Sequence, residues 1–499
     1  MLQERGSGIL LHPTSLPGPY GSGDFGQDAY RFIDWLSSAG QRYWQVLPMG
    51  QIGSGNSPYM SSSAFAGNIL LIDITELASH GWLTADDLQR LPGFRADKVA
   101  YDLVKPFRME VLKRASRNFL ASPSGPMHRE YASFCERESA WLDDYAMFMT
   151  IAERENQRSW LHWPAELVHR DQQALKELRE ECADDLQFWK FSQWCFSSQW
   201  SRLKEYANER GVRIIGDIPI FVAFQSADVW SHQKLFELDG EGNPLCVAGV
   251  PPDYFSETGQ LWGNPLYRWD VHKESGYSWW IARLKHALQI ADLVRIDHFR
   301  GFAEYWEIPA DAPNAIAGKW EPGPGKYLFN AFKQAFPDLP IIAEDLGLIT
   351  PDVYELRDEF NLPGMRVLQF AFGDGDSNHF LPHHYVANTV AYTGTHDNDT
   401  TLGWWNSAPD HIKAFAMKYL ASNGTEIVWD MMDALSSSVA NLVIFPMQDV
   451  LGLTTEHRMN YPGKADGNWE WRFSWDQVQD GQTSRMAKMS AGHHRSPQA

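Results

Sequence analysis

Ala291-Asp-Leu-Val-Arg-Ile-Asp-His-Phe-Arg-Gly301 is the stretch of sequence that decides the fold. Its leucine, valine and isoleucine favour a short buried strand. Because side chains alternate along a strand, Arg295 and Asp297 point to the same side, and the cation holds the carboxylate ionised. An ionised carboxylate at the carboxyl end of a barrel strand suits a nucleophile. A structural ion pair would show the same pattern, so this stretch alone leaves both interpretations open.

Seven other stretches have the composition of strands, and helical patterns separate most of them. They lie at 8–12, 42–48, 212–217, 340–345, 365–372, 389–397 and 440–445. Eight strands with intervening helices predict an α/β protein built on a (β/α)₈ TIM barrel with large insertions. Acids stand at or just past the ends of four strands: Asp217, Asp297, Glu344 with Asp345, and Asp397. Because barrel enzymes carry their active sites at the carboxyl ends of the strands, these acids predict a catalytic cluster.

The segments between the strands differ in character. A long charged stretch after the second strand has helical spacing, and a later one is rich in Gly, Pro, Asp and aromatic residues, which is typical of functional loops. The predicted organisation is a barrel start at 1–74, a mainly helical insertion at 75–209, the third strand at 210–220, an irregular subdomain near the active site at 221–280, the rest of the barrel at 281–482 and a flexible tail at 483–499.

Composition limits the partners. The 499 residues include 43 basic and 63 acidic side chains, and the net charge of −20 argues against nucleic acid. The sequence shows no run of 18 apolar residues and no signal peptide, which predicts a cytoplasmic protein with no membrane partner. The 22 tryptophans are compatible with carbohydrate binding, because a tryptophan has a flat apolar face and a polar edge. Most of them are nevertheless expected to be structural.

Two acids flanking the scissile bond are the usual arrangement for glycoside chemistry, and the chain offers such a pair. Asp297, beside Arg295, suits the ionised nucleophile. Glu344 ends an apolar strand, where desolvation raises the pKa of a carboxyl group and favours a proton donor. Asp397 follows His396, and both suit the binding of sugar hydroxyls. No zinc-type ligand spacing is completed, so no metal site is predicted.

Long motifs run almost from one end of the chain to the other. They are Leu11-His-Pro-Thr-Ser-Leu-Pro-Gly-Pro-Tyr-Gly, Asn56-Ser-Pro-Tyr59, Gly216-Asp-Ile-Pro-Ile, Gly249-Val-Pro-Pro-Asp-Tyr-Phe-Ser, Gln260-Leu-Trp-Gly-Asn-Pro, Arg295-Ile-Asp-His-Phe-Arg-Gly, Ala343-Glu-Asp-Leu-Gly, Gly394-Thr-His-Asp-Asn-Asp and Arg458-Met-Asn-Tyr-Pro-Gly. In them the chain resembles the amylomaltases, the 4-α-glucanotransferases or disproportionating enzymes of the α-amylase superfamily. The resemblance implies a barrel without the separate C-terminal β-domain of α-amylases.

The resemblance also implies roles for individual residues. Asp297 would be the nucleophile, Glu344 the general acid/base, and Asp397 the third carboxylate, which holds the sugar at the reacting subsite. That subsite would be supported by Arg295 and His396. The glucan groove would be lined by Tyr59, Asp217, Trp262, His298 and Asn460. The loop 249–256 would arch over the donor site with Asp253, Tyr254 and Phe255. Neither a metal nor an organic cofactor is implied.

Together these features predict a retaining transglycosylase that acts on maltooligosaccharides and α-1,4-glucans such as starch or glycogen, as a monomer or weak homo-oligomer. An α-amylase-like hydrolase would share all three acids and stays open as the alternative. A glucan-binding protein with a dead site is a second alternative. The intact acids argue against it, because a binding protein has no need of the set.

Overall fold

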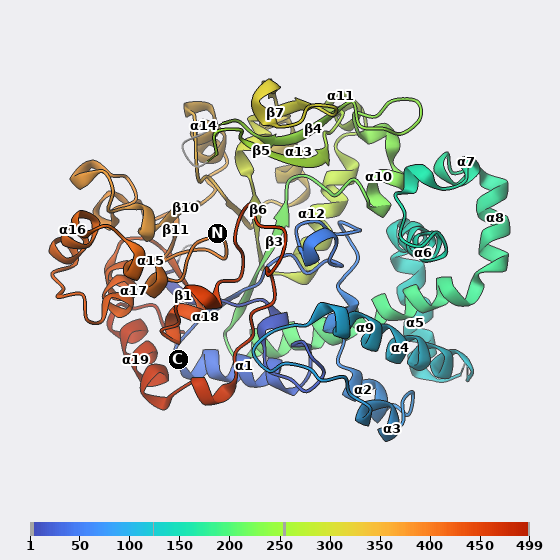
Figure 1. Cartoon of the computed structure of the whole chain (residues 1–499), viewed down its shortest axis with the longest axis horizontal. Helices are drawn as coiled ribbons and strands as arrows, with labels where there is room; N and C mark the ends of the chain where they lie inside the picture. The colour runs from blue at the N-terminus through green and yellow to red at the C-terminus, as the bar shows by residue number, and fades with distance from the viewer. Residues whose placement is uncertain (1–3, 123, 253–255, 498–499) are drawn as a thin grey trace.

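The computed structural model of the chain describes residues 4–122, 124–252 and 256–497. Within them, eight parallel strands close into a barrel in the order β1-β12-β11-β10-β9-β6-β3-β2, and helices surround it (Figure 1). The strands are β1 (Gly6–Leu10), β2 (Tyr43–Gln45), β3 (Arg213–Pro219), β6 (Leu293–Asp297), β9 (Ile341–Ala343), β10 (Gly364–Val367), β11 (Thr389–Tyr392) and β12 (Leu442–Pro446). The predicted (β/α)₈ barrel is confirmed, and each strand overlaps its predicted stretch.

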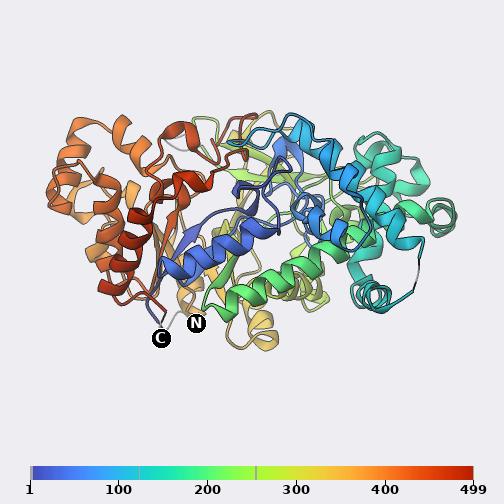
Figure 2. The same ribbon diagram turned by 90° about the horizontal axis from the view of Figure 1, so that it is seen from below.

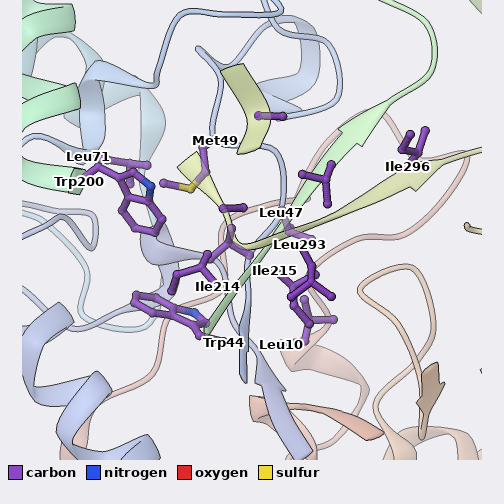
Figure 3. Packing of buried hydrophobic residues seen from close by; sticks show 14 of the residues in the cluster. Leu10, Trp44, Leu47, Met49, Leu71, Trp200, Ile214, Ile215, Leu293 and Ile296 are labelled. Carbon is purple, nitrogen blue, oxygen red and sulfur yellow. The ribbon is translucent and has the colours of Figure 1, made fainter. Parts of the chain in front are cut away.

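The barrel strands are buried on both of their sides, which explains their nearly continuous apolar sequences. In β6, for example, Leu293, Val294 and Ile296 are each at most 1% exposed. Figure 3 shows part of this core, where Leu293 of β6 lies near Ile215 of β3. An apolar interior of this kind keeps the strand ends in fixed positions, which a site built on several strands requires.

A helical insertion follows β2, and the long helix α9 ties it to the barrel. The insertion contains α2 (Ile74–Ser79), α3 (Ala85–Gln89), α4 (Tyr101–Leu120), α5 (Pro126–Arg137), α6 (Ser139–Arg154), α7 (Ala165–Val168), α8 (Gln172–Glu181) and α9 (Ala183–Glu209). On α9 the Gln193 amide bonds to the N–H and C=O of Gly67 at 2.7 and 2.9 Å, and Gln199 holds Asp73 in the same way. These amides supply the backbone partners that the loop after β2 needs. Figure 2 shows the insertion forming one end of the molecule.

The prediction of irregular structure at 221–280 is wrong in part. This segment contains α10 (Ala227–Ser231), β4 (Cys246–Val250), β5 (Gln260–Pro265) and α11 (Trp269–Glu274). The two strands join β7 (Glu304–Pro309) and β8 (Lys319–Pro322) in an antiparallel sheet of order β5-β4-β7-β8. The strand-type sequence pattern of β4 and β5 is weak because Gly and Pro interrupt it. Their partners also lie far away in the sequence, since Ala248 pairs with Glu307. The sheet lies by the end of β6, where the ring of Trp262 in β5 is 4.8 Å from that of His298.

The prediction of a flexible tail at 483–499 is also wrong for the residues that the structure describes. Helix α19 (Asp480–Gly492) buries Met486 completely, and Arg495 beyond it is 0% exposed. The Arg495 guanidinium donates hydrogen bonds to five backbone carbonyls, those of Gly6, Ser436, Ser438, Ala440 and Asn441. The small, polar composition of the tail gave no sign of this, because the carbonyls that Arg495 binds belong to segments far away in the sequence.

The remaining helices complete the layer around the barrel. They are α1 (Gln27–Ser38), α12 (Ser278–Ile290), α13 (Gly325–Ala335), α14 (Pro351–Glu359), α15 (Thr401–Ser407), α16 (Asp410–Leu420), α17 (Ile427–Ser437) and α18 (Met447–Val450). In the described part of the chain no strand follows β12. None of the described helices combines the length and apolar character needed to cross a membrane.

Replacing Arg495 by Ala is expected to lower the free energy of unfolding by about 2–4 kcal/mol, because it removes a fully buried guanidinium together with its charge-assisted hydrogen bonds. Arg485→Ala is the matched control. Arg485 lies on α19, is 42% exposed and pairs with Glu426 on the surface, so its loss should cost about 1 kcal/mol or less. Urea unfolding of the two variants measures the difference. Equal losses would contradict the anchoring role of Arg495.

Candidate active site

The carboxyl ends of β3, β6 and β9 lie side by side and bring the predicted acids together. In the parallel register Asp217 pairs with Arg295, and Ile296 pairs with Ala343. Asp297 therefore ends β6 beside Glu344, the residue that follows β9. The Glu344 N–H donates to the carbonyl of Ile296 at 3.2 Å, which continues the ladder to the acid itself. The position of Glu344 relative to Asp297 is thus set by barrel hydrogen bonds.

Arg295 lies at the centre of the site. Its Nη2 donates to Oδ1 of Asp297 at 2.7 Å, which confirms the predicted pair. Its Nη1 donates to both carboxylate oxygens of Asp217 at 2.9 and 2.7 Å, and the Tyr59 hydroxyl donates to Oδ2 of Asp217 at 2.8 Å. Burial alone lowers the pKa of Arg295, but Asp217 and Asp297 together hold it well above its usual range. The guanidinium therefore stays charged and fixes the direction of Asp297.

Glu344 is a carboxyl group whose proton is retained near neutral pH. Burial and the negative charge of Asp297 raise its pKa to about 8, although Arg295 and two backbone N–H groups oppose the rise. Those N–H groups belong to His298, 2.7 Å from Oε2, and Leu346, 2.9 Å from Oε1. They fix the rotamer of Glu344. The predicted rise of the Glu344 pKa is confirmed, and its main cause is the predicted desolvation of the carboxyl group.

The backbone of His298 is held in the left-handed region, with φ 57° and ψ 48°. This conformation is uncommon for a residue with a side chain and costs about 1–3 kcal/mol where it is imposed. Here it directs the His298 N–H at Glu344. Burial lowers the pKa of the imidazole to about 4, so the ring is neutral at pH 7. The ring stands edge to face against Trp262, at an interplanar angle of 84°.

Asp397 comes from the loop after β11 and is held by the chain beyond β12. The amide of Asn460 donates to its Oδ1 at 2.6 Å, and the guanidinium of Arg458 donates to its backbone carbonyl at 2.8 Å. The Nε2 of His396 lies 3.4 Å from the same Oδ1. The His396 ring stacks on Tyr59, with centroids 5.3 Å apart. Tyr59 thereby joins Asp397 to the group around Arg295.

The predicted site residues that the structure describes are linked by the contacts given above. Asp253, Tyr254 and Phe255 lie outside the described residues, so their place over the donor site stays a prediction. Sequence reasoning missed two contributors, Met365 and Arg458. The Met365 sulfur lies 3.4 Å from Nε of Arg295, and nothing in its apolar strand sequence indicates this. Arg458 opens a motif quoted above, and its separation of two residues from Asn460 was the available signal.

The fold and these contacts define the class of the protein. It has the features of a barrel enzyme that acts on glycosides. Acids, an arginine and aromatic side chains lie at the carboxyl ends of its parallel strands, and two of the acids form the pair typical of glycoside chemistry. In the part of the chain that the structure describes, no group of three or more His, Cys, Asp or Glu side chains is arranged to hold a metal ion.

Comparison with known proteins is consistent with this class. A family model described as 4-alpha-glucanotransferase matches residues 11–478. The 4-alpha-glucanotransferase of Thermus thermophilus is 51% identical over 98% of this chain and 99% of its own, and that of Synechocystis is 48% identical over 96% of both. An amylomaltase from Streptococcus agalactiae, solved in complex with acarbose, superposes with a TM-score of 0.96 at 39% identity, covering 99% of this chain and all of that one. The chain belongs to the 4-alpha-glucanotransferase family of enzymes.

The left-handed backbone at His298 predicts a difference between two variants of similar side-chain size. Asn adopts this conformation readily and Val does not. His298→Val should therefore lose about 1–3 kcal/mol more unfolding free energy than His298→Asn. Urea unfolding of both variants measures the difference. Equal stabilities would show that the backbone at this position can relax without cost.

Proposed function

We propose that this enzyme transfers α-1,4-glucan segments by a retaining mechanism, through a covalent glycosyl-enzyme formed on Asp297. The observation that carries the proposal is the contrast between two neighbouring acids. Asp297 is paired with a charged arginine, and the pKa of Glu344 is raised to about 8. One acid suited to attack and one suited to proton donation are what the first step of a retaining enzyme needs.

In the first step, an Asp297 oxygen attacks the anomeric carbon of an α-1,4-linked glucan. The glycosidic bond breaks, and Glu344 gives its proton to the departing 4-oxygen. Among the described contacts Arg295 engages Oδ1 of Asp297, so Oδ2 is the oxygen suited to attack. The product of the step is a β-linked glycosyl ester on Asp297, and Glu344 becomes a carboxylate.

In the second step, the 4-hydroxyl of an acceptor glucan attacks the anomeric carbon. Glu344 takes the hydroxyl proton, the ester bond breaks, and Asp297 is regenerated as a carboxylate. The two backbone N–H groups on Glu344 stabilise its charged form during the interval between the steps. The configuration at the anomeric carbon is inverted twice and therefore retained.

Asp397, supported by Asn460 and His396, is suited to hold hydroxyls of the reacting sugar. Tyr59 and Asp217 form the adjacent wall, and the aromatic face of Trp262 offers a stacking surface beyond His298. Maltooligosaccharides and the glucan chains of starch or glycogen are the substrates this arrangement fits. The proposal includes a cytoplasmic location and a monomeric or weakly homo-oligomeric state.

Maltotriose tests the proposal, because a transferase converts it into glucose and longer oligomers, whereas a hydrolase makes only shorter products. The native chain should give the longer series. Glu344→Gln should lower kcat about 10²–10⁴-fold, since Gln cannot donate the proton, and should still bind glucan. Glu359→Gln, an exposed acid at the end of α14, is the control and should leave turnover unchanged. Normal turnover of Glu344→Gln would refute the acid/base assignment.

The raised pKa of Glu344 predicts the alkaline limit of activity. The first step needs the protonated acid, which is present below about pH 8 and is lost as the pH rises through that value. The quantity kcat/KM, which reports ionisations of the free enzyme, should therefore fall above about pH 8. A pH series with maltotriose measures it. A fall beginning near pH 5, where an ordinary glutamic acid ionises, would contradict the proposed proton donor.

A further inference from the structure

A large hollow lies apart from the acids, and its lining residues come from the helical insertion, from α10 and from α12. Figure 1 shows where these helices lie. Its volume is about 1010 Å³, at the upper end of the range for ligand pockets. Trp141 of α6, Trp230 of α10, and Trp279 and His286 of α12 are among its lining residues, and none of the three catalytic acids is. We name this hollow the insertion groove.

Aromatic rings line one part of the insertion groove. Trp141 lies parallel to Phe65, with centroids 6.1 Å apart and an interplanar angle of 14°, and His286 lies 5.5 Å from both rings. Phe65 and Trp279 are buried, whereas Trp141 is partly exposed. The indole N–H of Trp141 is already satisfied by Glu138 at 2.9 Å, so the indole is fixed in orientation. A fixed, partly exposed indole is a stacking surface with little entropy to lose on binding.

The charges around the insertion groove largely cancel one another. Arg170 pairs with Asp144 at 2.6 Å, and Arg137 pairs with Glu138 at 2.9 Å. The lining holds four Lys or Arg side chains and three acids, which makes it near neutral in a chain of net charge −20. The lining also contains side chains with hydroxyl or amide groups, namely Ser231, Gln233, Ser275, Ser278 and Gln289. An uncharged ligand with many hydroxyls and apolar ring faces complements such a lining better than a polyanion does.

The loop after β2 separates the insertion groove from the active site. Ser63, Phe65 and His286 line the groove and also a smaller cavity of about 70 Å³. Tyr59 and Asp217 line that same small cavity. A glucan in the groove would therefore lie behind the wall that carries Tyr59, near the reacting subsite but without access to Asp297.

We propose that the insertion groove is a second, non-catalytic α-glucan-binding site that holds part of a long substrate while another segment reacts. The inference rests on the proposed function, because the ligand is that enzyme's own substrate. It gives the helical insertion a role in retaining polymers. Short donors that occupy only the reacting subsites gain nothing from the groove.

The kinetic test compares Trp141→Ala with the native enzyme on two substrates, soluble amylose and maltotriose. The variant should raise KM for amylose about fivefold, the effect of losing one aromatic anchor. It should leave kcat and all maltotriose kinetics unchanged. Trp141→Phe should restore most of the loss. Trp429→Ala is the matched control, because Trp429 is likewise a partly buried indole on a helix, α17, which lies at the opposite end of the molecule from α6 (Figure 1).

A second variant keeps the test decisive if Trp141→Ala folds poorly. Ala282 is exposed and lines the groove from α12, so Ala282→Trp fills the groove without removing a packed ring. Calorimetric titration of Glu344→Gln with maltoheptaose should show two sites, and adding Ala282→Trp should leave one. An unchanged number of sites, or equal KM changes for amylose and maltotriose, would overturn the inference. If the native chain made no longer oligomers from maltotriose, the proposed function would fail instead.

Discussion

One buried guanidinium joins the barrel wall to the acids at the carboxyl ends of the strands. Arg295, with a side chain 5% exposed, bonds to the fully buried carboxylate of Asp217 on β3 and to Asp297 at the end of its own strand. A buried charge that loses its partner typically costs about 3–5 kcal/mol, so neither carboxylate can move away freely. Arg295 also limits how far Asp297 raises the pKa of Glu344. The direction of Asp297 and the proton affinity of Glu344 thus depend on the same guanidinium.

Much of the fold was accessible from the sequence, because parallel barrel strands are short, apolar and end in functional residues. The stretch 291–301 and its seven counterparts predicted the eight strands, and the acids at their ends predicted the cluster. The sheet β5-β4-β7-β8 was missed, since its strands depend on partners far away in sequence. The order at Arg495 was missed because carbonyls from distant segments create it. The contact between Met365 and Arg295 arises from barrel closure, which a one-dimensional pattern does not contain.

The tryptophans show why composition is a weak guide to a site. Six of them are among the largest fully buried side chains: Trp44, Trp160, Trp189, Trp200, Trp230 and Trp280. They pack between the helices and the barrel and inside the helical insertion, in agreement with the expectation that most tryptophans are structural. Trp262 and Trp141 differ because each is partly exposed and held by a polar or aromatic neighbour. The distinction depends on burial and could not be drawn from the residue type.

The barrel closes by pairing its first strand with its last, since Gly6 to Leu10 of β1 lie against Leu442 to Pro446 of β12. During synthesis β1 leaves the ribosome long before β12 exists. At about 5–20 residues per second the interval is on the order of a minute. One edge of β1 therefore stays unpaired while most of the chain emerges, and an unpaired strand edge invites association with other chains. The nascent chain is consequently exposed to such association until β12 has been made, and the ring of strand ends that carries the acids cannot close before then.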